Sequence, residues 1–505
     1  MSRLRSLAKE SFAYGISSLL SRFLNFLLVP FYTHVLTPGE FGVSNIVFAI
    51  VAFLNIVYQA GFDSAYLRLA HDASKDESAA GPEKTRRLFS TALWSQAGVS
   101  LTCTVPFLLA APWISAAFNV PVQYGSLFGL AAVILALDAL AVVPMAHLRF
   151  RRKALWFAGI RMGNVVVNIA GNLVFVLWLH KGLQGVFLAN VIASAFTLVL
   201  LAPVLLSNLR ITYDFSGLKP LLAFGLPFVP AGLYGIVNEM AGRLFLSRLA
   251  PSDVTRLYPG TGWNTLDLTG VFSASWKLGV FGLLLVQMYR LAWQPFFLRH
   301  HSDADAPALF GRVLRALLLF IGVAGLALTL FLDKLVALPV MGKPLIAPAF
   351  WPGLPIVPGI LLAYALQAWC VHFTLGVYIA KKTSSLVWIN GAGAVVTVIF
   401  SLWLVPALGL WGAVWAAVAC YVVMGVLMTR RSQSLYRIDL DWPKLIPVLL
   451  WLTYCFSAGF WVQAHTGAHL PLRAALLAVG VLLPFGIGAV GKSETATLRR
   501  LILRR

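Results

Sequence analysis

The chain has 505 residues, of which 59% are hydrophobic and only 11% are charged, with 39 Lys and Arg against 18 Asp and Glu. A soluble domain carries about 25% charged residues, so this composition excludes a protein that keeps its whole surface in water. Intrinsic disorder needs the opposite balance, and a disulfide scaffold would need more than the four cysteines present. The Lys and Arg fall in short clusters between apolar runs, which favours an all-α polytopic membrane protein over a nucleic-acid binder.

The apolar runs, taken in chain order, predict about 14 membrane-spanning helices of roughly 20 residues each. The first run lacks a small-residue cleavage site, so we expect an uncleaved first span. It is followed by a helix start in which Thr37 is the N-cap, Pro38 the first helical residue and Glu40 the partner in a capping box. The expected spans are 11–36, 41–63, 88–110, 125–148, 155–179, 185–207, 219–247, 268–298, 313–338, 356–380, 384–406, 409–429, 445–464 and 472–490.

Lys and Arg are distributed unevenly between the two sides of this predicted topology. With the N-terminus in the cytoplasm, 27 of them fall in cytoplasmic segments and 6 in segments on the opposite side. Cytoplasmic loops of membrane proteins carry the excess of Lys and Arg, so both termini are expected in the cytoplasm. The longest connections are expected at 70–87, on the cytoplasmic side, and at 250–267, on the opposite side.

The two halves of the sequence resemble each other. The first expected span opens with Phe12-Ala13-Tyr14-Gly15 and the seventh with Leu222-Ala223-Phe224-Gly225. An even number of spans separates the copies, so the repeats are parallel, as in transporters with two bundles around a substrate path. We predict two pseudo-symmetric six-helix bundles, then two extra helices with a basic tail, at 1–210, 211–430 and 431–505.

Several cations fall inside expected spans, where each costs about 3 kcal/mol or more on the insertion scale. Arg315 lies near a span end, and its head group is expected to reach the interface. The others should face an aqueous cavity or pair with an anion, and arginine binds phosphate oxygens bidentately. The candidate substrate-binding residues are therefore Arg22, Arg161, Arg243, Lys277 and Arg290.

Asp138 and Glu239 are the clearly internal carboxylates of the expected spans. Both are candidates for coupling transport to an ion such as H⁺ or Na⁺. Glu239 also lies four residues before Arg243, so the two side chains share a helix face. An ion pair with Glu239 is thus the structural alternative to a substrate-binding role for Arg243.

An ordered set of short segments carries a family resemblance: Ser21-Arg22, Leu36 to Gly42, Gly61-Phe62-Asp63, Phe224 to Pro227, and Ala292 to Phe296. In this order they resemble the polysaccharide-transporter family of the multidrug/oligosaccharidyl-lipid/polysaccharide (MOP) exporter superfamily, which includes the O-antigen flippases. The resemblance implies flipping of an undecaprenyl-pyrophosphate-linked oligosaccharide to the outer leaflet of the bacterial inner membrane by alternating access. It also implies a cationic central cavity. Gly242 departs from the family, which often has Asp before the arginine of the seventh span.

Other functions fit parts of the same pattern. A drug or cation antiporter on this scaffold would depend on Asp138 or Glu239, and a peptidoglycan-precursor flippase would differ in the glycan it carries. A membrane glycosyltransferase or polymerase is less favoured, because Asp303-Ala304-Asp305 and Asp439-Leu440-Asp441 match a short DxD pattern only within short loops. The sequence has no Walker motif. The expected partners are a lipid-linked oligosaccharide, membrane lipids and a coupling ion, with no enzyme activity, cofactor, metal or nucleic acid.

Overall fold

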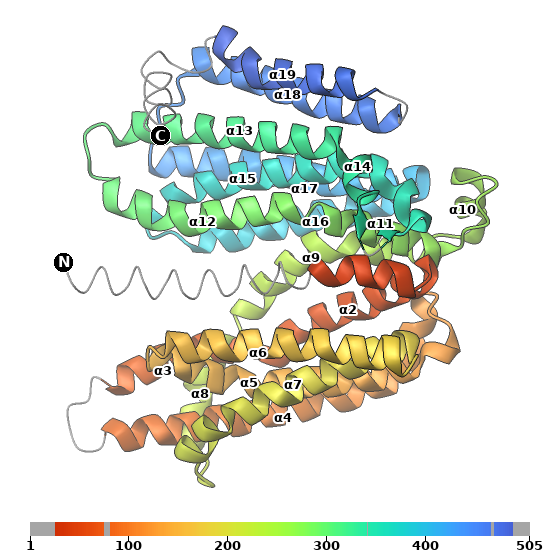
Figure 1. Cartoon of the computed structure of the whole chain (residues 1–505). Coiled ribbons are helices and arrows are strands. Elements are labelled where there is room, and N and C mark those ends of the chain that lie inside the picture. Colours follow the sequence, from red (N-terminus) through yellow and green to blue (C-terminus); the bar gives the residue numbers. More distant parts are fainter. Residues whose placement is uncertain (1–25, 75–80, 341, 466–468, 488–505) are drawn as a thin grey trace. The chain divides into compact units, whose positions relative to one another are not determined.

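The computed structural model describes residues 26–74, 81–340, 342–465 and 469–487 (Figure 1). The predicted all-α membrane fold is confirmed. The β-structure within these residues is one short hairpin, in which β1 (Pro339–Val340) pairs with β2 (Lys343–Pro344). Eleven described helices are long and apolar enough to span a membrane, or 12 if the bent pair α11 (Thr265–Leu278) and α12 (Val280–His300) is one span.

The expected total of about 14 spans is not confirmed. Short apolar helices, Phe26–Val35 and α19 (Leu470–Gly486), stand where the first and last spans were expected. Residues 1–25, which hold Arg22, lie outside the described part of the chain.

The chain divides into two compact units. The first contains residues 1–273 and 401–409, and the second contains residues 274–400 and 410–505. The predicted bundle boundary at residue 210 stays a prediction. The helices of the first unit are α2 (Pro38–Gln59), α3 (Phe62–Ser74), α4 (Gly81–Ala117), α5 (Ser126–Phe150), α6 (Ala154–Asn172), α7 (Gly182–Asn208), α8 (Phe215–Gly225), α9 (Phe228–Leu246) and α10 (Pro251–Leu257).

The start of α2 has the predicted capping box. The Glu40 amide donates to Thr37 Oγ1 at 3.2 Å, and the Thr37 amide donates to Glu40 Oε2 at 2.9 Å. Pro38 occupies the first helical position, where its missing N–H is not needed. These contacts fix the beginning of α2, the helix that carries one wall of the site described below.

Two helix breaks of the first unit meet. The chain turns between α2 and α3 at Ala60 and Gly61, whose φ angles of 47° and 68° are left-handed. A Cβ on Gly61 would lie 2.2 Å from the carbonyl oxygen of Gly225, at the end of α8. The two backbones can approach this closely because both residues lack a side chain.

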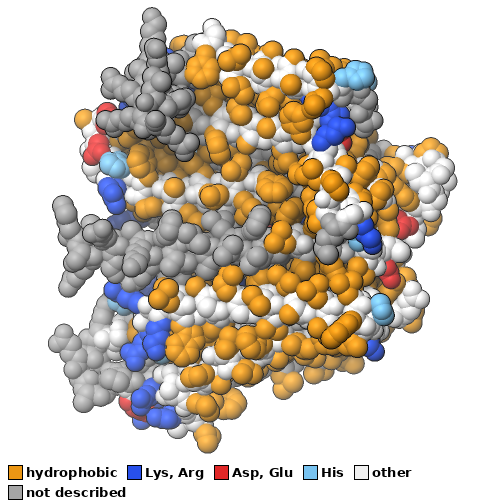
Figure 2. Space-filling view, in the orientation of Figure 1, with side chains coloured by type: hydrophobic (Ala, Val, Ile, Leu, Met, Phe, Trp, Pro, Cys, Tyr) orange, Lys and Arg blue, Asp and Glu red, His pale blue; other side chains and the backbone are white. Residues whose placement is uncertain are grey.

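In the first unit α5 packs against α4, α7 and α3, and α6 packs against α7. The buried apolar cluster of α3, α4 and α5 includes Tyr66 and Phe89. Tyr66 also pairs through its hydroxyl with His147 Nδ1 at 2.7 Å. Figure 2 shows hydrophobic side chains along these helices and Lys and Arg at the end of the unit that carries the α5–α6 turn, where residues 151–153 are exposed.

The segment expected as an open connection at 250–267 contains α10 and part of α11. Gly260 and Gly262 adopt φ angles of 75° and 68° in the turn between them. Arg256 donates to Asp253 Oδ1 at 2.9 Å and to the carbonyl oxygen of Pro406 at 2.8 Å. The segment is therefore a folded turn held by hydrogen bonds.

The second unit is centred on α15 (Val357–Ile379), which packs against α12, α13 (Ala306–Leu330) and α17 (Leu410–Leu435). The helix pair α18 (Trp442–Ala464) and α19 packs on α13. The remaining elements are α14 (Leu332–Val336), the 3₁₀ segment Pro348–Ile356 and α16 (Ser384–Leu408), whose last residues belong to the first unit.

Two cations of the second unit are placed differently from the sequence expectation. Arg315 is only 4% exposed and contacts Asp441 Oδ2 at 3.3 Å, so its head group is paired in the protein. Arg473, expected in a connection opposite the cytoplasm, is buried in α19. It pairs with Asp333 and donates to the carbonyl oxygen of Leu330 at 2.9 Å.

Candidate functional site

A polar cavity of about 390 Å³ lies among the helices of the first unit. Its lining comes from α2, α3, α5, α6 and α7. Polar side chains are costly inside a membrane-spanning bundle and mark an aqueous or ligand-binding site. Four amides, two carboxylates, two guanidinium groups and two hydroxyls line the cavity: Asn55, Gln59, Asn164, Asn190, Asp63, Asp138, Arg149, Arg161, Ser194 and Thr197.

Helical spacing brings these side chains together. On α7 the lining residues are Asn190, Ala193, Ser194 and Thr197, at offsets of three, four and seven residues, which fall on one helix face. Residues 157, 160, 161 and 164 repeat the same spacing on α6. The cavity is therefore the meeting point of polar stripes on otherwise apolar helices.

Hydrogen bonds between helices shape the cavity wall. Ser194 Oγ donates to Asp138 Oδ1 at 2.7 Å and so connects α7 to α5. Asn164 Nδ2 donates to the carbonyl oxygen of Ala193 and to Thr197 Oγ1, both at 3.0 Å, and so connects α6 to α7. Because bonds of this kind hold both partners in one rotamer, the polar groups are pre-positioned.

The charges that line the cavity are balanced. Arg149 Nη2 lies 3.3 Å from Asp63 Oδ2. Arg161 stacks over the ring of Phe157, with 5.4 Å between the guanidinium carbon and the ring centroid. Two carboxylates therefore face two guanidinium groups. The lining of this cavity differs in that respect from the net-positive cavity that the sequence led us to expect.

The structure brings together two of the residues singled out from sequence, Asp138 and Arg161. Arg243 is elsewhere in the first unit, 5% exposed on α9, and its Nη1 donates to the backbone carbonyl of Glu239 at 3.0 Å. Lys277 is half-buried in α11 and Arg290 is exposed midway along α12, both in the second unit.

The neutral residues of the cavity were not identified from the sequence. A search for charges inside apolar runs finds Asp138 and Arg161 but passes over the amides and hydroxyls. The signal that would have found Asn190, Ser194 and Thr197 is their spacing, because polar residues at offsets of four and seven share a helix face.

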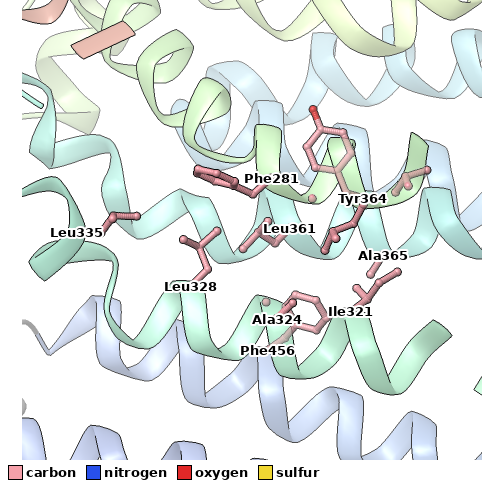
Figure 3. A pocket seen from close by; sticks show the side chains of 13 residues that line it. Phe281, Ile321, Ala324, Leu328, Leu335, Leu361, Tyr364, Ala365 and Phe456 are labelled. Atoms are coloured by element: carbon pink, nitrogen blue, oxygen red, sulfur yellow. The ribbon is translucent and has the colours of Figure 1, made fainter. Parts of the chain in front are cut away.

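The second unit contains a cavity of a different kind. About 340 Å³ in volume, it lies between α12, α13, α14, α15 and α18 (Figure 3). The side chains that point into it include Phe281, Ile321, Leu328, Leu361 and Phe456, which are all apolar. Its chemistry suits hydrocarbon, in contrast to the polar cavity of the first unit.

Comparisons with known proteins show what the chain is similar to. Residues 32–254 match a family model described as polysaccharide biosynthesis protein. No protein of curated function matches the sequence significantly.

Solved structures share the fold at low identity. The lipid II flippase MurJ in an inward closed conformation superposes with a TM-score of 0.68 at 13% identity, covering 93% of this chain and 98% of that one. A multidrug resistance MATE transporter of the MOP superfamily, inward-facing, gives a TM-score of 0.62 at 15% identity, covering 82% and 95%. The MATE transporter VcmN of Vibrio cholerae gives 0.52 at 13% identity, covering 86% and 98%.

The chain therefore shares its all-α fold with these solved transporters. The match to the polysaccharide biosynthesis model covers residues 32–254, which is less than half of the chain.

Proposed function

We propose that the protein is a flippase that moves an undecaprenyl-pyrophosphate-linked oligosaccharide from the cytoplasmic to the outer leaflet of the bacterial inner membrane by alternating access. The observation that carries this proposal is the polar cavity sunk among membrane-spanning helices of the first unit. A sugar head group needs such a wet path, because each unpaired polar group in hydrocarbon costs several kcal/mol. The family match over residues 32–254 connects the cavity to polysaccharide biosynthesis.

The pyrophosphate is assigned to the cations Arg22, Arg161, Arg243, Lys277 and Arg290. Support comes from their positions within apolar segments and from the bidentate fit of guanidinium to phosphate oxygens. Arg161 lies in the wall of the polar cavity, and Arg290 has an exposed side chain. The isoprenoid tail stays in hydrocarbon.

The energy source is assigned to an H⁺ or Na⁺ gradient acting through Asp138 or Glu239. Asp138 is the stronger candidate, because it lines the polar cavity and accepts a hydrogen bond from Ser194 on another helix. Loading an ion on Asp138 would change that contact and hence the packing of α5 on α7.

The orientation is proposed with both termini in the cytoplasm. Support comes from the 27 to 6 distribution of Lys and Arg between the two expected sides. Basic residues 151–153 and Arg86 and Arg87 then attract the anionic head group to the cytoplasmic leaflet.

Two related functions are the alternatives, and the first is a peptidoglycan-precursor flippase. MurJ is named a lipid II flippase, and it superposes over 93% of this chain, which favours a lipid-linked substrate. A drug or cation antiporter is the second alternative, since two of the superposed structures are named MATE transporters. An enzyme acting on lipid-linked sugars is less favoured than either.

Complementation of a strain that lacks its own flippase tests the proposal. Export of surface glycan should be restored by the wild type and reduced at least about tenfold by Arg290→Ala, if removal of one charged hydrogen bond costs about 1.5–3 kcal/mol. Arg312→Ala is the matched control, because Arg312 pairs with Asp305 at 3.7 Å in an exposed position. Full export by well-expressed Arg290→Ala would remove Arg290 from the proposed site, and no export by the wild type would contradict the function.

A further inference from the structure

The amides of the polar cavity present hydrogen-bond acceptors. Asn190 Nδ2 donates to the carbonyl oxygen of Val186 at 2.9 Å, one turn earlier in α7. Gln59 Nε2 donates to Asn55 Oδ1 at 2.8 Å. In both residues one N–H is bound by the protein itself, which orients the side chain, while the carbonyl oxygen has two lone pairs.

The hydroxyl groups of a sugar are donors and acceptors at once, and adjacent hydroxyls fit the spacing of the two ends of an amide. Each of these two amides, Asn190 and Gln59, also has a second N–H, so the pair offers donors as well as acceptors to the same ring. Phe157 and Ile160 add an apolar wall on α6, which suits the C–H face of a pyranose ring.

The size and the charge of the cavity fit a sugar ring better than a bare ion. The cavity volume of about 390 Å³ is within the range of about 300–1,000 Å³ found for small-molecule sites. The cavity volume is far larger than the roughly 30 Å³ that one water molecule occupies in the liquid. The two carboxylates of the lining are matched by Arg149 and Arg161, so the lining has no net charge and suits an uncharged ring.

We propose that the polar cavity of the first unit is a monosaccharide subsite, which binds one uncharged sugar ring of the lipid-linked glycan through Asn190, Gln59 and Asn164. The inference rests on the proposed function and adds to it a place for one sugar ring, beside the cations assigned to the pyrophosphate. The flippase then selects cargo by its glycan as well as by its charge.

A matched pair of substitutions on α7 isolates the sugar contact. Asn190 and Asn208 are both half-buried, and each donates Nδ2 to the carbonyl oxygen one turn earlier, at 2.9 and 2.8 Å. Only Asn190 of these two lines the cavity. Asn190→Leu and Asn208→Leu therefore remove the same helical contact at similar volume, and Asn208→Leu also removes a 2.9 Å bond to Ser207 Oγ. Gln59→Met provides a second cavity variant.

The measurement is equilibrium binding of short-chain polyprenyl pyrophosphate, with or without one N-acetylhexosamine, to the detergent-solubilised full-length protein. The wild type should bind the glycosylated compound more tightly. Asn190→Leu and Gln59→Met should each weaken binding of that compound about three- to tenfold, as expected for one lost neutral hydrogen bond. They should leave the affinity for the bare pyrophosphate unchanged, and Asn208→Leu should change neither.

Equal affinity of the wild type for the two compounds would overturn the subsite. So would cavity variants that weaken both compounds equally, or that alter only the Na⁺ or pH dependence of binding, which would make the cavity an ion site. Transport is measured separately in vesicles. A wild type that transports but shows no sugar preference refutes the subsite alone, whereas a wild type that prefers the glycosylated compound but shows no transport refutes the proposed function.

Discussion

At the scale of single residues, the candidate site could be predicted only where it carries charge. Asp138 and Arg161 stand out in apolar sequence because burial of a charge is costly. Asn190 and Ser194 carry no charge, so only their position on a shared face reveals them. The pairing of Asp63 with Arg149 joins residues 86 positions apart and follows from the packing of α3 on α5.

Glycine at position 61 is required by both conformation and space. Gly61→Ala should lower the free energy of unfolding by at least about 2 kcal/mol, from the left-handed backbone and from overpacking against Gly225. The melting temperature in detergent measures this loss. Gly98→Ala is the control, because a Cβ there meets nothing within 4 Å. Equal melting temperatures for Gly61→Ala and the wild type would contradict the close crossing of the two backbones.

Asp441 gives the protein an acid-sensitive contact. The hydrogen bond from Lys444, followed by the charges of Lys444 and Arg315, lowers the pKa of the Asp441 carboxyl. A carboxyl whose pKa is lower in the folded state stabilises the fold above its unfolded pKa of about 3.9, and this stability is lost as pH falls through the folded pKa. Asp441→Asn should therefore be less stable than the wild type at pH 7, and the difference in melting temperature should shrink in acid. A difference that stays constant between neutral and acidic pH would show that the carboxylate charge has no such role.

At the scale of elements, helix positions were predictable while helix partners were not. The capping box of Thr37 and Glu40 forms as expected, because its signal is local in sequence. The break between α11 and α12 falls inside an expected single span, and the bend there is 42°. Arg473 was expected in a connection, and its pairing could not be predicted because its partner Asp333 lies 140 residues earlier.

The attachment of α19 to α13 and α14 depends on Arg473. This side chain is 1% exposed and bonds both Asp333 and the end of α13. Removing one member of a buried ion pair leaves the other uncompensated and costs about 3–5 kcal/mol. Arg473→Met should thus destabilise the protein strongly, as should Asp333→Asn.

A double-mutant cycle measures how far the two residues act together. The combined Arg473→Met and Asp333→Asn variant should lose less stability than the sum of the two single losses, because it leaves no unpaired charge. Strictly additive losses would mean that Arg473 stabilises α19 through the Leu330 carbonyl instead.

At the scale of the whole molecule, composition and charge distribution predicted the fold class. An apolar fraction of 59% leaves few architectures other than a polytopic helical protein. The number of spans was harder to predict, because helices break at Gly61, at Pro227 and at Gly279 without leaving the apolar pattern. Which side chains line a common cavity depends on how the helices pack. The apolar pattern of a single sequence does not show which helices are neighbours.

The central claim is movement of a lipid-linked glycan across a bilayer. The most direct measurement uses purified protein in vesicles whose lipid carries a fluorescently labelled oligosaccharide on undecaprenyl pyrophosphate, with an added membrane-impermeant quencher. With the protein present, label should pass between leaflets, so that the quenched fraction rises above that of protein-free vesicles, and Arg290→Ala should slow this rise. A quenched fraction equal to that of protein-free vesicles, together with export of a cationic drug by the same preparation, would contradict the flippase and establish the antiporter.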